Sequence, residues 1–149
     1  MTRPAAWGRA KSTARRARAH PEQDLQIAAV QYLRLALPDC QIIHCPNGGK
    51  RGKAEGAIFK AMGVQAGVAD LLVCRGAWDQ EFRAGKYHYT PPFIGWIELK
   101  ATAGRLSASQ KAFRLECEAK NIPWKEARSL NEIESIVRMW GLDPRAAVG

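Results

Sequence analysis

The stretch that decides the fold is GWIELKATAGRLSASQ, residues 95–110. Its first half has the composition of a buried strand, yet Glu98 and Lys100 stand two residues apart in it. Side chains at that spacing lie on the same face of a strand, so both charges point together while Ile97 and Leu99 point into packing. Burying a carboxylate and an ammonium is costly unless each group finds a partner or a metal ion. The sequence therefore predicts a polar site on one face of this strand, although an exposed ion pair would also explain the spacing.

A second acid is expected to lie close to Glu98. Asp70 stands at the start of another apolar segment, GVADLLVC, residues 67–74. If the two strands pair around residues 75–92, Asp70 reaches Glu98, and two carboxylates about 4 Å apart repel by roughly 4 kcal/mol at an effective dielectric constant near 20. Such a pair must share a proton or bind a cation, and oxygen ligands suit Mg²⁺ or Mn²⁺. Lys100 would then face the water or phosphate oxygens beside the ion.

The rest of the pattern predicts one α/β domain with helices on the faces of a sheet. We expect helices over residues 21–37, 54–64, 107–121 and 129–140, and strands within residues 40–45, 67–74, 93–101 and 122–127. Ser107 is a predicted N-cap, and Ser129 with Glu132 a predicted capping box. Residues 75–92 form an excursion between two strands, and either a flap that contacts DNA or a β-hairpin extension would fit them.

The net charge of +9 comes mainly from one end of the chain. Residues 1–20 hold six basic residues and no acid, whereas the other 129 residues hold 17 basic and 14 acidic groups. We expect residues 1–20 to be a basic tail, disordered on its own, that contacts the phosphates of a nucleic acid. A solubilising extension that contacts nothing is the alternative.

The composition argues against a membrane protein and against a secreted one. No window approaches 18 consecutive apolar residues, and the basic N-terminus lacks the apolar core of a signal peptide, so a cytoplasmic location is expected. The four cysteines form no C-x-x-C pair and match no zinc pattern, which predicts buried free thiols at Cys40, Cys45, Cys74 and Cys117.

Two segments together carry a family resemblance. GVADLLV followed by FIGWIELK resembles the D…E-x-K signature of the PD-(D/E)XK nucleases, with Asp70, Glu98 and Lys100 at its three positions. With HCPNGGKR, MGVQAGVADLLV and IELKATAGRLSASQKAF in this order, the chain resembles the VRR-NUC (virus-type replication-repair nuclease) domains over about residues 21–141. The stand-alone versions in phages and prophages are the most similar in layout. Ala69 stands where that family often has proline, but this position shapes a turn and supplies no ligand.

The resemblance implies a restriction-endonuclease-like core, a small mixed β-sheet flanked by helices, with residues 21–149 as a single nuclease domain. It implies a Mg²⁺- or Mn²⁺-dependent deoxyribonuclease in which Asp70 and Glu98 ligate the ion and Lys100 orients or activates the attacking water. Gln110 would contact the site or the scissile phosphate. Glu22 matches the family's early helical acid, a further ligand, although the helix dipole alone also explains an acid there.

The resemblance also implies a substrate and an assembly. The stand-alone members resemble Holliday-junction resolvases, so we expect cleavage of branched DNA in DNA repair by a C2 homodimer. Such an enzyme would be phage or prophage encoded and act in the cytoplasm of a bacterial host. Two alternatives stay open: a non-catalytic DNA-binding module, and a nicking or restriction-like endonuclease that acts on plain duplex.

Basic residues around the glycine-rich segment PNGGKRGK, residues 46–53, are the expected DNA contacts, because glycine-turn amides and cations together bind phosphate. A solvated loop is the alternative for this segment. The full set of expected DNA contacts is Asn47, Lys50, Arg51, Lys53, Arg105, Arg15, Arg16 and Arg18. We interpret His44 as a packed or hydrogen-bonded strand residue rather than a catalytic base, and Trp78, Tyr87 and Tyr89 as packing aromatics rather than base-stacking ones.

Overall fold

The computed structural model describes residues 20–46, 52–76 and 79–149. The predictions made for the basic tail, including Arg15, Arg16 and Arg18, fall outside these ranges. So do those made for Asn47, Lys50, Arg51 and Trp78.

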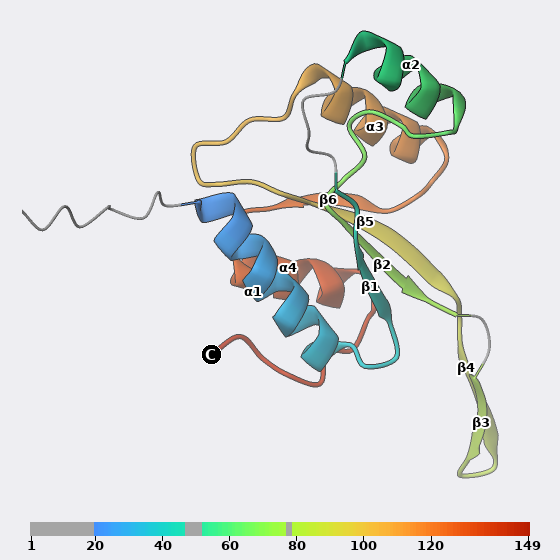
Figure 1. The fold of residues 1–149 in the computed structure, drawn as a ribbon. Coiled ribbons are helices and arrows are strands. Elements are labelled where there is room, and N and C mark those ends of the chain that lie inside the picture. Colours follow the sequence, from blue (N-terminus) through green and yellow to red (C-terminus); the bar gives the residue numbers. More distant parts are fainter. Residues whose placement is uncertain (1–19, 47–51, 77–78) are drawn as a thin grey trace, which may run out of the picture.

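One four-stranded mixed sheet forms the centre of the chain (Figure 1). Its strands are β1 (Gln41–His44), β2 (Leu71–Arg75), β5 (Phe93–Leu99) and β6 (Trp124–Ala127), in that spatial order. β1, β2 and β5 pair antiparallel, and β6 pairs parallel to β5. The parallel pair arises because the chain crosses from β5 to β6 through a helix, whereas the residues between β2 and β5 turn straight back.

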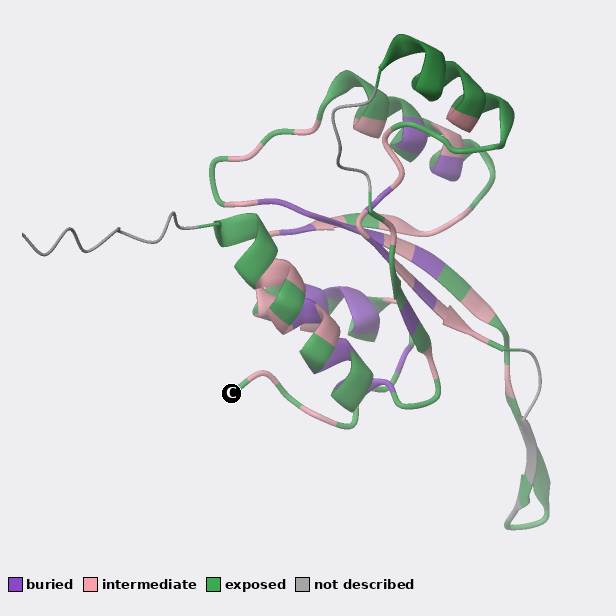
Figure 2. Ribbon diagram, in the orientation of Figure 1, coloured by how far each residue is buried: buried purple, intermediate pink, exposed green. Residues whose placement is uncertain are grey.

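Helices cover the two faces of this sheet in separate groups (Figure 1). α1 (Pro21–Ala36) and α4 (Leu130–Met139) lie together on one face. α3 (Ala108–Ala119) lies on the other face, and α2 (Lys53–Ala61) lies outside it, with none of its described residues buried (Figure 2). The predicted α/β class and helix-flanked mixed sheet are confirmed. None of the described helices combines the length and the apolarity that crossing a membrane requires.

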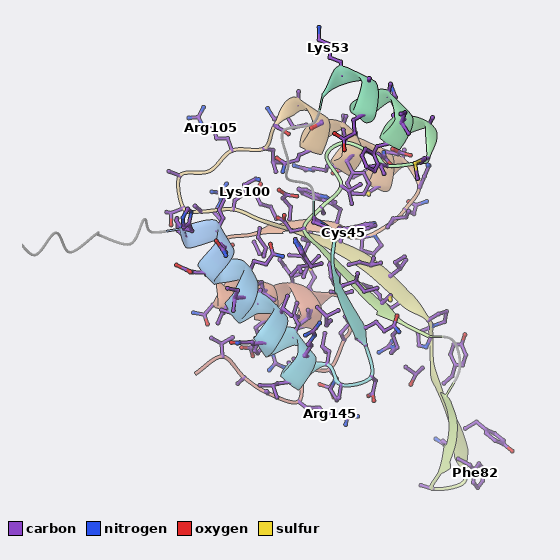
Figure 3. The ribbon with its side chains drawn as sticks, viewed as in Figure 1. Cys45, Lys53, Phe82, Lys100, Arg105 and Arg145 are labelled. Atoms are coloured by element: carbon purple, nitrogen blue, oxygen red, sulfur yellow. The ribbon has the colours of Figure 1, made fainter. Side chains whose placement is uncertain are left out.

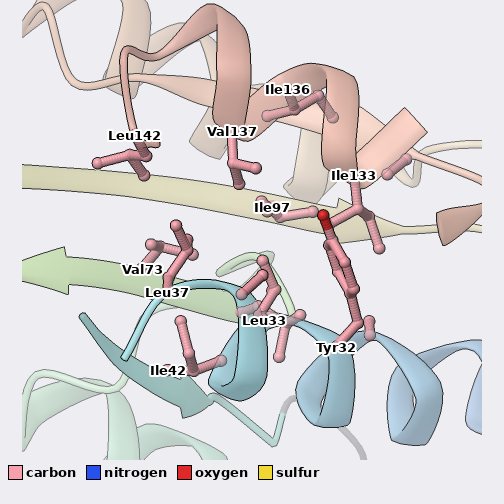
Figure 4. Packing of buried hydrophobic residues seen from close by; sticks show 14 of the residues in the cluster. Tyr32, Leu33, Leu37, Ile42, Val73, Ile97, Ile133, Ile136, Val137 and Leu142 are labelled. Carbon is pink, nitrogen blue, oxygen red and sulfur yellow. The ribbon is translucent and has the colours of Figure 1, made fainter. Parts of the chain in front are cut away.

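The main core lies between the sheet and the α1–α4 layer (Figure 4). Leu33 from α1, Leu71 from β2 and Ile133 from α4 are all fully buried in it. Ile97 of β5 joins them, and its alternation with Glu98 sends the carboxylate to the opposite face. On that face Trp96 packs edge-on against Phe113 of α3, with ring centroids 5.4 Å apart. One strand thus supplies the core on one face and the charged group on the other.

The helix ends follow the predicted caps with one correction. The Ser107 hydroxyl accepts a hydrogen bond from the Gln110 amide, and the Gln110 side chain accepts one from the Ser107 amide, so α3 has a full capping box. The Ser129 hydroxyl accepts from the Glu132 amide as expected. The Glu132 carboxylate, however, accepts from the amide of Arg128 instead of that of Ser129. The predicted box at α4 is therefore wrong in its second half.

Residues 79–90 form a β-hairpin, which settles the architecture of the excursion but leaves DNA contact untested. β3 (Asp79–Arg83) and β4 (Lys86–Thr90) pair in a two-stranded sheet of their own that projects from the body (Figure 1). Tyr87 is 73% exposed and packs against Phe82 of the same hairpin, with ring centroids 5.0 Å apart. Tyr89 is 49% exposed. Tyr87 thus packs within the hairpin, as the sequence led us to expect, and stacking of Tyr87 or Tyr89 on bases is untested.

The four cysteines are free thiols, as predicted. Only Cys117 is buried, and the other three are half-buried, so the expected full burial is wrong for those three. Burial raises the pKa of the Cys117 thiol.

The turn before Asp70 packs tightly against the start of α3. Gly67 has a φ of +78° in this turn, and a Cβ there would overlap the backbone of Ser109 and lie 2.6 Å from the Gln110 amide nitrogen. Gly63, in the same connection, has a φ of +92°, and a Cβ there would meet no atom within 4 Å. Glycine is thus needed at Gly63 for its conformation alone, and at Gly67 for conformation and close approach.

This difference makes a matched pair of variants. Gly63→Ala should lower the free energy of unfolding by about 1–2 kcal/mol, the usual strain of a left-handed alanine. Gly67→Ala should cost a further 1–3 kcal/mol, roughly, because it adds overpacking against backbone that cannot rotate away. Urea unfolding of the two variants measures the difference, and equal losses would contradict close packing at Gly67.

Candidate active site

Five of the residues singled out by the sequence lie around one open pocket. Glu22, Asp70, Lys100 and Gln110 line this pocket of about 530 Å³, together with Gln23, Gln26, Ile27, His44 and Leu99. Glu98 does not line it but contacts two side chains that do. The site therefore draws on α1, β1, β2, β5 and α3 at once.

The Glu98 carboxylate is the buried centre of the site. Its side chain is fully removed from solvent, and Lys100 is only 8% exposed. Oε1 accepts a hydrogen bond from the Gln110 side-chain amide at 2.5 Å and pairs with the Lys100 ammonium at 2.7 Å. Oε2 is buried and has no hydrogen-bond partner in the described part of the chain. The negative charge of this carboxylate is therefore balanced by hydrogen-bond donors at one oxygen and not at the other.

Asp70 reaches Glu98 through the pairing of β2 with β5. Leu71 is opposite Ile97 in the register, which places Asp70 beside Glu98 as predicted. The Asp70 Oδ2 accepts a hydrogen bond from the Leu99 amide at 2.8 Å, so its side chain is fixed to β5. Its carbonyl oxygen accepts from the Cys45 amide at 2.9 Å, which fixes its backbone to β1.

Burial shapes the acidity of both carboxyl groups. It raises the pKa of Glu98 from the ordinary 4.5 to about 7, with the neighbouring Asp70 charge adding to the increase and Lys100 opposing it. It also raises the pKa of Asp70, against the Leu99 hydrogen bond and the charges of Lys100 and His44. Both groups are thus short of positive charge, which is what a bound cation would supply.

These residues fit a divalent cation held by oxygen ligands. Asp70 and Glu98 provide paired carboxylates, and Glu98 Oε2 has no hydrogen-bond donor in the described part of the chain. No three His, Cys, Asp or Glu side chains among residues 20–46, 52–76 and 79–149 are placed to hold a metal ion. A pair is sufficient for Mg²⁺, which is usually held by one or two carboxylates with water and substrate phosphates completing its shell.

Glu22 lies at the rim of the same pocket, in the first turn of α1. Its Oε1 accepts a hydrogen bond from the Ala101 amide at 3.3 Å. This contact ties α1 to the segment that follows Lys100. The predicted role of Glu22 as a third ligand stays a prediction, since its recorded partner is a backbone amide.

The sequence did not single out Gln26, and it indicated His44 only as a packed or hydrogen-bonded residue. Both line the pocket, and the Gln26 side chain contacts His44 Nδ1, which lies 3.0 Å from the Asp70 carbonyl oxygen. His44 is hydrogen-bonded, as expected of a strand histidine. Gln26 follows Glu22 by one helical turn, so the i, i+4 spacing was the signal that could have found it.

Of the basic residues expected to bind DNA, Lys53 and Arg105 are the two that the structure describes. Neither lines the pocket. Lys53 stands at the first turn of α2, and Arg105 on the loop between β5 and α3 (Figure 3). Both are exposed, and both are labelled with Lys100 in the upper half of the view in Figure 3. Their contact with DNA stays a prediction.

Structure comparison identifies a similar solved chain. It is a VRR_NUC domain protein, matched with a TM-score of 0.58 and 21% sequence identity over 85% of this chain and 93% of that chain. This chain has the VRR-NUC fold. No family model matches the sequence, and no curated protein matches it in sequence. The similarity is one of fold, and the roles expected of Asp70, Glu98 and Lys100 stay predictions.

The raised pKa of Glu98 predicts a pH-dependent stability in the absence of metal. Because the folded protein favours protonated Glu98, the stabilisation is complete below about pH 4.5 and is lost as the pH rises through about 7. Glu98→Gln keeps a neutral group at every pH. Its free energy of unfolding, relative to that of the wild type, should therefore rise by about 2–3 kcal/mol between about pH 5 and about pH 9.

Urea unfolding in EDTA at the two pH values measures this change. Glu118→Gln is the matched control, because it removes an exposed carboxylate of α3. A stability difference between Glu98→Gln and the wild type that does not vary with pH would contradict the raised pKa.

Proposed function

We propose that this chain is a metal-dependent nuclease that hydrolyses phosphodiester bonds of DNA, with residues 21–149 as the nuclease domain. The observation that carries the proposal is the fully buried Glu98 carboxylate, beside Asp70 and Lys100, whose Oε2 has no hydrogen-bond partner among the described residues. A buried acid that only stabilised the fold would be expected to have both oxygens satisfied.

Asp70 and Glu98 would hold Mg²⁺ or Mn²⁺, with Glu22 available at the rim. When bound, such an ion supplies a Lewis acid that stabilises the negative charge developing on the phosphoryl group. The Leu99 amide keeps the Asp70 carboxylate in place, and Gln110 with Lys100 keeps Glu98 Oε1 in place. The orientation of the acidic pair is thus set by contacts from two segments of the chain, the end of β5 and the first turn of α3.

Lys100 supplies the fixed positive charge of the site. Its ammonium contacts Glu98 and its side chain lines the pocket, so it can hold and orient the attacking water next to the carboxylates. Gln110 lines the same pocket and can donate to a phosphate oxygen through its second amide hydrogen. His44 and Gln26 add polar groups to the pocket lining, and His44 Nδ1 lies 3.0 Å from the Asp70 carbonyl oxygen.

For the substrate we propose branched DNA, cut by a homodimer in the manner of a Holliday-junction resolvase during DNA repair. This part rests on the resemblance of the sequence to stand-alone phage and prophage nucleases, which would place the activity in the cytoplasm of a bacterial host. The basic excess of the chain supports a polyanionic partner, and the exposed Lys53 and Arg105 are suited to contact its phosphates.

The proposal predicts cleavage that depends on both metal and site. Asp70→Asn, Glu98→Gln and Lys100→Ala should each lower the cleavage rate by roughly 100-fold or more, since each removes charge placed at the reacting phosphate. DNA binding should survive, because the basic surface is intact. Lys125→Ala is the matched control, since Lys125 is exposed on β6 and should be dispensable.

The assay uses labelled four-way junction, flap, nicked, single-stranded and plain duplex DNA with Mg²⁺, Mn²⁺ or EDTA. Symmetric cuts confined to the junction support a resolvase, and equal cutting of plain duplex supports a nicking or restriction-like enzyme instead. Binding without cleavage in either metal would support the non-catalytic module. Undiminished cleavage by all three site variants would rule out the site.

A further inference from the structure

A single arginine outside the pocket holds the turn that follows Lys100. Arg128 Nη1 donates to the carbonyl oxygens of Ala101, at 2.6 Å, and Thr102, at 3.0 Å. Its Nη2 donates to the Gly104 carbonyl at 2.9 Å and also pairs with Glu126. The Gly104 amide donates back to the Ala101 carbonyl at 2.8 Å, which closes the turn.

This contact needs the shape of a guanidinium. Three carbonyl oxygens that converge on one point repel one another, so the turn is stable only with donors at its centre. Arginine presents five N–H groups in a planar fork and can serve all three carbonyls at once. Lysine carries the same charge as one compact ammonium, and it cannot span carbonyls spread over residues 101–104 in this way.

The turn borders the candidate active site on two sides. Lys100 precedes it directly, and the Ala101 amide donates to Glu22 Oε1. Gly104 lies so close to both that a Cβ there would be 3.1 Å from Glu22 Oε1 and 3.3 Å from Lys100 Cδ. A shift of the turn would therefore move the Lys100 side chain and the Glu22 carboxylate together.

Arg128 is itself firmly anchored. It directly follows β6, whose last residue, Ala127, is fully buried and accepts a hydrogen bond from the Lys100 amide at 3.0 Å. The Arg128 amide donates to Glu132 Oε2 of α4 at 2.7 Å. The guanidinium thus connects a rigid strand end to the turn, and it reaches the site only through that turn.

We infer that Arg128 is a positioning residue of the proposed nuclease: its guanidinium sets the turn 101–104 and so the placement of Lys100 and Glu22 at the pocket. The inference rests on the proposed function for its catalytic consequence. Its structural content, the fixing of residues 101–104 by the guanidinium fork, can be tested on the protein alone.

The test compares Arg128→Lys with Arg138→Lys. Arg138 pairs with Glu134 on the exposed surface of α4, so its replacement is the matched control for the loss of one guanidinium. For Arg128→Lys, kcat for cleavage of the best DNA substrate should fall about 10- to 100-fold while KM stays close to the wild-type value, since misplaced catalytic groups slow the chemical step. Arg138→Lys should match the wild type in both constants.

Hydrogen exchange of the metal-free protein gives a second readout that does not depend on cleavage. The amides of Lys100, Ala101 and Gly104 donate to turn, strand or helix partners, so they should exchange faster in Arg128→Lys, with no change at the core amides of β5. Unchanged exchange at these three amides would overturn the inference, whether or not the wild type cuts DNA.

The remaining outcomes of the cleavage assay also test the inference. A rise in KM with unchanged kcat would overturn the inference, because it would make Arg128 a DNA-contacting residue. An unchanged kcat and KM would overturn it as well. If the wild type cuts no DNA, the proposed function fails, and faster exchange confined to the turn still supports the positioning role. A second variant, Arg128→Gln, removes the charge as well as the guanidinium shape. If that variant fails to fold, the result for Arg128→Lys alone tests the inference.

Discussion

The buried carboxylate of Glu98 is the constraint on which the site depends. It lies on a strand whose other face is the main hydrophobic core, so it cannot move to solvent without displacing Ile97. One of its oxygens is held by Lys100 and Gln110, and the other has no hydrogen-bond partner in the described part of the chain. Burial leaves the group with a pKa near 7 and short of positive charge. Protonation of Glu98 would relieve this in the metal-free protein, and we propose that a cation shared with Asp70 does so in the working enzyme.

Each neighbouring element contributes one restraint to that centre. Pairing of β2 with β5 brings Asp70 alongside, and the close approach at Gly67 keeps the preceding turn against the first turn of α3. The capping box of Ser107 and Gln110 starts α3 at a position from which the side-chain amide of Gln110 reaches the Glu98 carboxylate. Arg128 and Glu22 hold the segment after Lys100 from opposite sides. The site is therefore built from elements far apart in the sequence as well as from local contacts such as that between Glu98 and Lys100.

The local features of this arrangement could be predicted from the sequence, and the distant ones could not. Strand alternation placed Glu98 and Lys100 on one face, and the serine at position 107 correctly marked the start of a helix. The partner of Arg128 is a turn 24–27 residues away, and no pattern in the sequence pairs a guanidinium with backbone carbonyls. The second half of the α4 capping box failed although it is local, since the Glu132 carboxylate accepts from the Arg128 amide, one residue before the N-cap. The sequence did not distinguish a β-hairpin from a flap in residues 75–92. The aromatic residues of this segment are typical of packed positions, so they gave no sign that the segment projects from the body.

Direct binding of Mn²⁺ to the metal-free protein tests the central claim most closely. Isothermal titration calorimetry of the wild type, Asp70→Asn, Glu98→Gln and the control Lys125→Ala measures affinity without requiring cleavage of any DNA. Saturable binding by the wild type and by Lys125→Ala, with loss of binding in both acid variants, is the predicted result. Mn²⁺ binding of equal affinity in all four proteins, or none to the wild type, would contradict the claim that Glu98 and Asp70 are buried together to hold a cation.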